Sequence, residues 1–213
     1  MGLVVKSQGG NFEPIEGGTY QAVCYSLIDL GTQHSEFNGK ARKLRKVLLG
    51  WEIPELRIDV EKEGKKVSRP RVISKTYTLS LHEKSQLYKD LVSWRGRPFT
   101  AAELEGFDLF TILKANCLLQ VINETKNGKT YAHISSISKL MRGMAPKQPE
   151  NEVVYYSIVD HSMQIPANVP EWVLKIIQKS DEYLMVEQAK GVFNPETAED
   201  SEENPPINDD IPF

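Results

Sequence analysis

The sequence predicts a mainly β fold, a small five-stranded barrel with one helix between its third and fourth strands. Three observations lead to this prediction. Stretches of alternating polar and apolar residues recur between turn signals, as in half-buried strands. Residues 82–94 change to the three- and four-residue spacing of an amphipathic helix. An Asn-Gly pair at 127–128 separates two strand-like runs, which is the strongest short signal of a β-hairpin.

Three strands are expected within residues 18–81. "GTYQAVCYSLIDLG" alternates and stops at Gly31, and "VLLGWEI" follows after a basic stretch that we predict to be a loop around Asn38-Gly39. Residues 54–70 are charged and carry prolines, which indicates a long exposed loop or an extended hairpin tip. "RVISKTYTLSL" alternates again and is the third expected strand.

A helix is expected after the third strand. "HEKSQLYKDLVSW" spaces its apolar residues for one helix face, and Gly96 is a suitable C-terminal stop. Thr100 with Glu103 three residues later forms a capping-box pattern for one further turn of helix. Arg95 and Arg97 lie at the helix end, where cations complement the helix dipole, so a structural role is favoured over DNA binding.

The remaining elements are the hairpin around 127–128, a short strand in "VVYYSIVDH" and a helix at about 170–189. The order of strand, strand, strand, helix, strand, strand is that of the OB-fold, a five-stranded Greek-key barrel, although other small β-barrels also fit. The predicted organisation has four parts: a flexible N-terminal arm (1–16), an OB domain (17–140), a C-terminal extension (141–190) and a disordered acidic tail (191–213).

Charge is unevenly distributed along the chain. Residues 1–150 contain 23 Lys and Arg against 16 Asp and Glu, a balance of +7, whereas residues 151–213 contain 3 against 13, a balance of −10. A basic body with an acidic tail is typical of proteins that handle nucleic acid, although it also serves solubility alone.

Several classes of activity lack their motifs. No zinc-ligand spacing, phosphate-binding loop or nucleophile elbow is present, so no catalytic residue, metal or cofactor is expected. Asp29, Glu52 and Asp59 are the carboxylates that a metal-dependent nuclease would need, but each is more simply a polar-face residue. Cys24 and Cys117 are expected to be buried reduced thiols, and no membrane span is expected.

Binding of single-stranded DNA without sequence preference requires cations along the backbone and aromatic faces for the bases. The candidate cations lie between the first two expected strands, at the third strand and at the hairpin tip: Lys40, Arg42, Lys43, Arg45, Lys46, Arg69, Arg71, Lys75, Lys126 and Lys129. The candidate stacking residues are Phe37, Trp51, Tyr77 and Tyr131. Core packing is the competing interpretation for Trp51 and Tyr77, and Trp94, Trp172, Phe99, Phe107 and Phe110 are expected in the core.

The chain ends in "DDIPF" on an acidic stretch, which resembles the end of bacterial single-stranded DNA-binding proteins. The body stretches "GTYQAVCYSLIDLGTQ", "GWEIPE", "SWRGRPFTAAELEGFDL" and "CLLQVINETKNGKTYAHISSIS" are similar to single-stranded DNA-binding proteins of tailed bacteriophages. The resemblance covers most of residues 17–140 and the final residues.

This resemblance implies an OB barrel that binds single strands, and a tail that docks replication, recombination or repair proteins of phage or host. The implied docking residues are Asp209, Asp210, Ile211, Pro212 and Phe213. The implied location is the cytoplasm of an infected bacterium. An adaptor whose barrel binds protein, or a metal-dependent nuclease, is an alternative. The oligomeric state, monomer or dimer, is left open.

Overall fold

The computed structural model describes residues 13–37, 39–62 and 64–189, apart from the side chains of Phe37 and Lys62. Within this part of the chain the fold is mainly β, with four short α-helices and one 3-10 turn, η1 (Leu109–Ile112). Among these helices none is long and apolar enough to cross a membrane.

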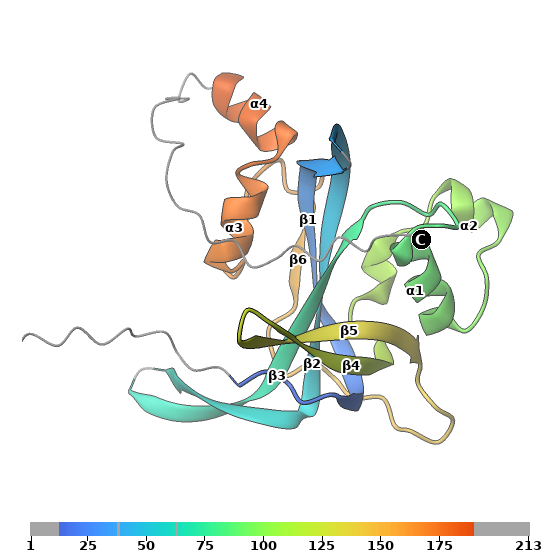
Figure 1. The fold of residues 1–213 in the computed structure, drawn as a ribbon, viewed down its shortest axis with the longest axis vertical. Helices are drawn as coiled ribbons and strands as arrows, with labels where there is room; N and C mark the ends of the chain where they lie inside the picture. Colours follow the sequence, from blue (N-terminus) through green and yellow to red (C-terminus); the bar gives the residue numbers. More distant parts are fainter. Residues whose placement is uncertain (1–12, 38, 63, 190–213) are drawn as a thin grey trace, which may run out of the picture.

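Six strands form one sheet (Figure 1). Five of them follow the order β3-β2-β1-β4-β5 with antiparallel neighbours, and β6 pairs with β1 in parallel. Their bounds are β1 (Gly18–Phe37), β2 (Lys40–Lys62), β3 (Lys65–Thr78), β4 (Asn116–Lys126), β5 (Lys129–Lys139) and β6 (Val154–Tyr156).

Strand β1 joins two halves of the sheet because its two ends have different partners. Residues 18–23 pair with β4, and residues 23–37 pair with β2 across two register shifts. In Figure 1 the β4–β5 hairpin crosses in front of the long β1–β3 strands. The two ends of the strand path approach each other, since Lys75 Nζ on β3 donates a hydrogen bond of 3.4 Å to the Ile134 carbonyl on β5. The sheet therefore curls into a barrel-like shape.

The first hydrophobic core lies between the curled sheet and α1 (Gln86–Arg95). Trp51 on β2 and Trp94 on α1 pack with ring centroids 5.8 Å apart. The helix begins at Ser85, whose side chain accepts from the Tyr88 amide, and ends at Gly96 in the left-handed conformation. Both the predicted helix and its predicted stop are confirmed. The capping box of Thr100 and Glu103 also forms, at the start of α2 (Ala101–Glu105).

Both cysteines lie in this first core. Cys24 and Cys117 are fully buried free thiols, as predicted. Burial raises the pKa of Cys24 to about 12 and also raises that of Cys117.

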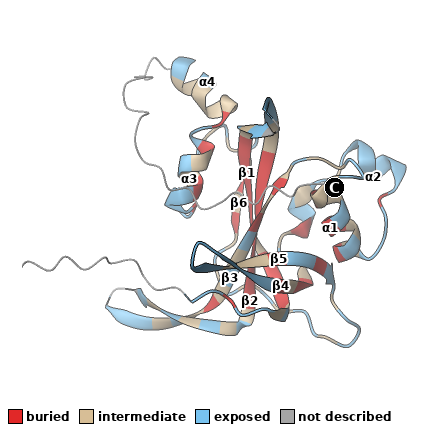
Figure 2. Cartoon of the chain, in the orientation of Figure 1, coloured by how far each residue is buried: buried red, intermediate tan, exposed pale blue. Residues whose placement is uncertain are grey.

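A second core lies on the outer face of β1 and β2, under the C-terminal extension. Strand β6, α3 (Glu171–Ile177) and α4 (Asp181–Ala189) lie along this face, with buried residues on the inner side of α3 (Figure 2). Glu52 of β2 is fully buried and accepts hydrogen bonds from the amides of Glu150 and Asn151, at 2.7 and 2.9 Å. These bonds hold the start of the C-terminal extension against the sheet. Glu52 is thus an anchor and not the polar-face residue that we expected.

Two element predictions are wrong. The basic stretch around Asn38-Gly39 is not a loop, because residues 23–37 of β1 pair with residues 40–52 of β2, and the last pair is Phe37 with Lys40. The helix expected at about 170–189 is two helices, α3 and α4. It is interrupted where Ser180 is fully buried against Gly31, which has φ +72° and no side chain to obstruct the contact. For residues 54–70 the extended-hairpin alternative is confirmed.

Candidate nucleic-acid interface

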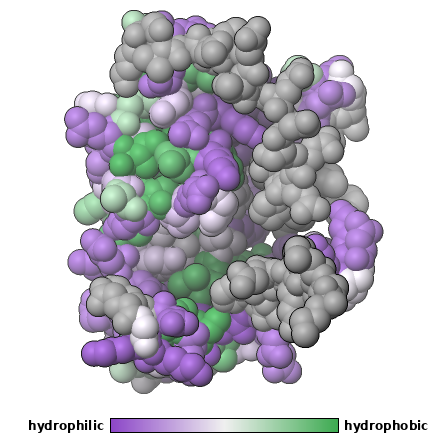
Figure 3. Space-filling model, turned by 90° about the vertical axis from the view of Figure 1, so that its left-hand side faces the viewer, coloured by the Kyte–Doolittle hydropathy of each residue, from purple (hydrophilic) through white to green (hydrophobic). Residues whose placement is uncertain are grey.

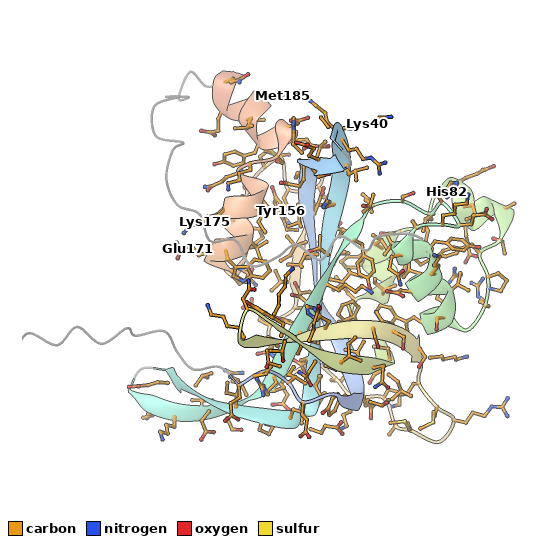
Figure 4. The ribbon with its side chains drawn as sticks, in the orientation of Figure 1. Lys40, His82, Tyr156, Glu171, Lys175 and Met185 are labelled. Carbon is orange, nitrogen blue, oxygen red and sulfur yellow. The ribbon has the colours of Figure 1, made fainter. Side chains whose placement is uncertain are left out.

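The exposed cations of the sheet gather at the tips of two hairpins. Lys40 and Arg42 lie near the end of the β1–β2 hairpin, and Lys126 and Lys129 flank the turn of the β4–β5 hairpin. All four side chains are exposed. Figure 4 shows Lys40 at the end of the β1–β2 hairpin.

The β4–β5 turn places two cations side by side. Asn127 and Gly128 both have positive φ, 52° and 75°, which is the two-residue hairpin turn that the Asn-Gly pair predicts. Lys126 is the direct register partner of Lys129. Like charges opposite each other in a sheet are destabilising. A bound anion such as phosphate would therefore reduce the repulsion between these two ammonium groups. Tyr131 follows on β5, half-buried and stacked on His133 at a centroid distance of 6.4 Å.

Two of the predicted cations are held by carboxylates. Lys43 Nζ donates to Asp181 Oδ2 of α4 at 3.0 Å, and the His34 ring contacts the same carboxylate. Arg45 forms a two-point contact with Asp29, with Arg45 NH2 2.5 Å from Asp29 Oδ2. Hydrogen bonds from His34, and then from Lys43, lower the pKa of Asp181.

Four predicted contact residues are buried, and their predicted roles in DNA binding are wrong. Trp51 and Tyr77 are 0% and 3% exposed, so their ring faces belong to the core and cannot stack on a base. Lys75 is buried because Asp90 Oδ2 accepts from both Lys75 Nζ, at 3.0 Å, and the Tyr77 hydroxyl, at 2.8 Å. Lys46 is only 4% exposed and does not reach the surface.

The cations of β3 are partly accessible. Arg69 and Arg71 are half-buried, and Arg71 donates to the backbone carbonyl of Glu13. On β2, Arg57 makes a two-point ion pair with Glu150, at 2.7 and 3.0 Å.

The contacts of Arg95 and Arg97 agree with a structural role. Their partner is the side chain of Glu103, and not the carbonyls at the end of α1 as expected. Both guanidinium groups bind the carboxylate of Glu103. Arg95 also lies over the rings of Phe99 and Phe107, at 4.2 and 4.9 Å from their centroids.

Sequence reasoning missed a pocket on the outer face of the sheet. The pocket has a volume of about 350 Å³ and lies between α3, the segment before β6 and strands β1–β3. Trp172, expected in the core, is 45% exposed and lines this pocket together with Tyr25. In Figure 3 hydrophobic side chains gather at the height of α3, surrounded by hydrophilic ones.

In the sequence, Trp172 and Ile176 are four residues apart, as are Val173 and Ile177, so helical spacing alone does not show which pair faces the core. Val173 and Ile177, four residues apart, are the fully buried residues of α3, so the core-facing stripe of this helix does not include Trp172. Phe110 was also expected in the core but is 52% exposed, where it packs edge-on against Tyr155.

Some predicted residues lie outside the part of the chain that the structure describes. These are the docking residues Asp209 to Phe213 and the side chain of Phe37. Within the described ranges, no group of three or more His, Cys, Asp or Glu side chains could hold a metal ion.

No protein-family model matches the chain, and a search of curated proteins finds no match either.

Proposed function

We propose that the protein binds single-stranded DNA without sequence specificity and has no catalytic step. The observation that carries the proposal is the pair of cationic hairpin tips, Lys40 with Arg42 and Lys126 with Lys129, all exposed. In an OB-fold the hairpins between strands 1 and 2 and between strands 4 and 5 border the strand-binding face. Cations at both borders suit a polyanionic backbone that crosses the face between them.

We further propose that the curled sheet is an OB-fold. Its strand path and the position of α1 between β3 and β4 support this assignment. The similarity of the body to phage single-stranded DNA-binding proteins supports the same assignment and the same function.

The acidic chain end supplies the second part of the proposal, which is the recruitment of replication, recombination or repair proteins through residues 209–213. Phe213 supplies an aromatic ring, and Asp209 and Asp210 supply carboxylates close to it in the sequence. A partner pocket with an apolar floor and a cation at its mouth would bind both groups. Burial of the ring contributes about 1.5–3 kcal/mol, and a charge-assisted bond contributes a further ~1.5–3 kcal/mol.

The test is fluorescence anisotropy with dye-labelled dT strands of several lengths, mixed-sequence strands and a duplex of equal length. We expect dT and mixed strands to bind with similar affinity and the duplex to bind much more weakly. Labelled strands should stay intact after incubation with magnesium, which separates this function from a nuclease. Absence of binding at low salt, or a preference for duplex, would overturn the proposal.

A further inference from the structure

The pocket beside α3 has a size and a lining that suit a flat, uncharged ring. Trp172, Tyr25 and Val72 supply aromatic and apolar surface, while Ser74 and Asn168 supply hydrogen-bond donors and acceptors. Its volume of about 350 Å³ lies in the range of small-ligand sites.

The charges around the pocket exclude an anionic occupant. No Lys or Arg is among the described residues that line it, and its one ionisable acid is Glu152. A phosphate or a terminal carboxylate placed there would meet like charge with no cation to offset it. A neutral ring with polar edges meets no such repulsion.

Helix α3, which carries Trp172, is packed firmly against the sheet. Val173 and Ile177 are fully buried on the neighbouring face of α3, which fixes the helix against β1 and β2. The backbone that carries the indole is therefore already ordered before binding. Figure 4 places Glu171 and Lys175, the charged pair of α3, on the side of the helix away from the sheet.

We propose that this pocket binds one nucleobase of the single strand, stacked on Trp172. The inference rests on the proposed function and deepens it, because it makes the C-terminal extension a part of the DNA-binding face.

The chain's own aromatic end is the competing occupant. Phe213 is preceded by the carboxylates of Asp209 and Asp210. Those charges would lie near Glu152, so the neutral base is the better match.

The experiment exploits the three tryptophans of the chain. Trp51 and Trp94 are 0% and 6% exposed, which leaves Trp172 as the indole that a base can reach. We expect dT strands to quench the intrinsic fluorescence of the full-length protein. By anisotropy, W172A should bind about 5- to 150-fold more weakly, while W172F should keep most of the affinity. F110A removes another half-exposed aromatic that does not line the pocket, and should bind like wild type.

Each outcome decides one claim. If wild type binds strands but W172A binds equally well, the base pocket is wrong and the proposed function stands. If wild type binds no strand, the proposed function fails, and this inference fails with it. Circular dichroism and thermal melting of W172A check the fold. If W172A does not fold, the quenching of wild-type fluorescence by dT decides, because Trp172 is the exposed indole, and absence of quenching on binding would overturn the proposal. Quenching by a peptide of the last ten residues, with none by dT, would assign the pocket to the chain end and overturn the proposal.

Discussion

At the scale of single residues, the buried carboxylate of Asp90 holds the inner side of β3 against α1. Its side chain is 9% exposed and accepts from Lys75, Tyr77 and Gln86. We predict that D90A lowers the free energy of unfolding by about 3–5 kcal/mol, because it leaves the Lys75 ammonium buried without this partner. Urea denaturation measures the change. E83A removes an exposed carboxylate and should shift stability by less than about 0.5 kcal/mol; equal effects of the two variants would contradict this role.

A second residue-scale prediction concerns acid stability. The hydrogen bond from Arg97, followed by that from the Thr100 amide, lowers the pKa of Glu103 to about 2. A depressed pKa means that the ionised form stabilises the fold. This contribution is complete above the ordinary glutamate pKa of about 4.3 and is lost as the pH falls towards about 2.

We therefore predict that E103Q is less stable than wild type at pH 6 and that this difference shrinks progressively below about pH 4. Denaturation midpoints from pH 2 to pH 7 test the prediction, and E105Q on the same helix is the control. A difference between E103Q and wild type that stays constant across this range would rule out the linkage.

At the scale of elements, the β4–β5 turn depends on one glycine. Gly128 has φ +75°, a conformation that costs a residue with a side chain about 1–2 kcal/mol. We predict that G128A destabilises the protein by about this amount in thermal or urea unfolding. Gly106 is extended, with φ −172° and no atom within 4 Å of an added Cβ, so G106A should be neutral or slightly stabilising. A neutral G128A would contradict the turn geometry.

Helix α4 covers part of the cationic β1–β2 hairpin through Asp181. We predict that D181N strengthens binding of single strands about 1.5- to 5-fold at low salt, because it frees Lys43 from an ion pair of ordinary surface strength. The matched control E171Q breaks the exposed Glu171–Lys175 pair on α3 and should leave affinity unchanged. If both variants bind like wild type, the face of the β1–β2 hairpin that carries Lys43 does not contact DNA.

Elements with strong local signals were predictable from the sequence. The Asn-Gly hairpin, α1 with its Gly96 stop and the capping box of α2 all depend on contacts within a few residues. The errors arose where distant residues decide the outcome. The β1–β2 ladder extends through a basic stretch because Asp29 and Asp181 pair with Arg45 and Lys43. The break between α3 and α4 depends on the contact of Ser180 with Gly31.

At the scale of the whole molecule, the alternation of polar and apolar residues predicted which cations and aromatic residues lie on strands. It did not predict which face of each strand is covered by other elements. Lys75 and Tyr77 belong to the buried side of β3, while the exposed Trp172 belongs to a pocket that only the folded extension creates. The candidate site was therefore predictable at its hairpin tips, where exposure follows from the turn itself. It was not predictable on the sheet face, where burial depends on packing against other elements, such as Asp90 of α1 and Ile134 of β5 against Lys75.

The most direct measurement of the central claim is a salt titration of the affinity for oligo-dT. Each phosphate contact adds about 0.7 to the slope of log affinity against log salt. We predict a clear negative slope for wild type and a slope shallower by about 1.4 for K126A/K129A. The matched control K84A/K89A removes two exposed lysines, one just before α1 and one within it, and should keep the wild-type slope. In Figure 1, α1 lies across the long strands from the β4–β5 turn. Wild-type affinity that does not depend on salt, or equal slopes for the two double variants, would contradict the account.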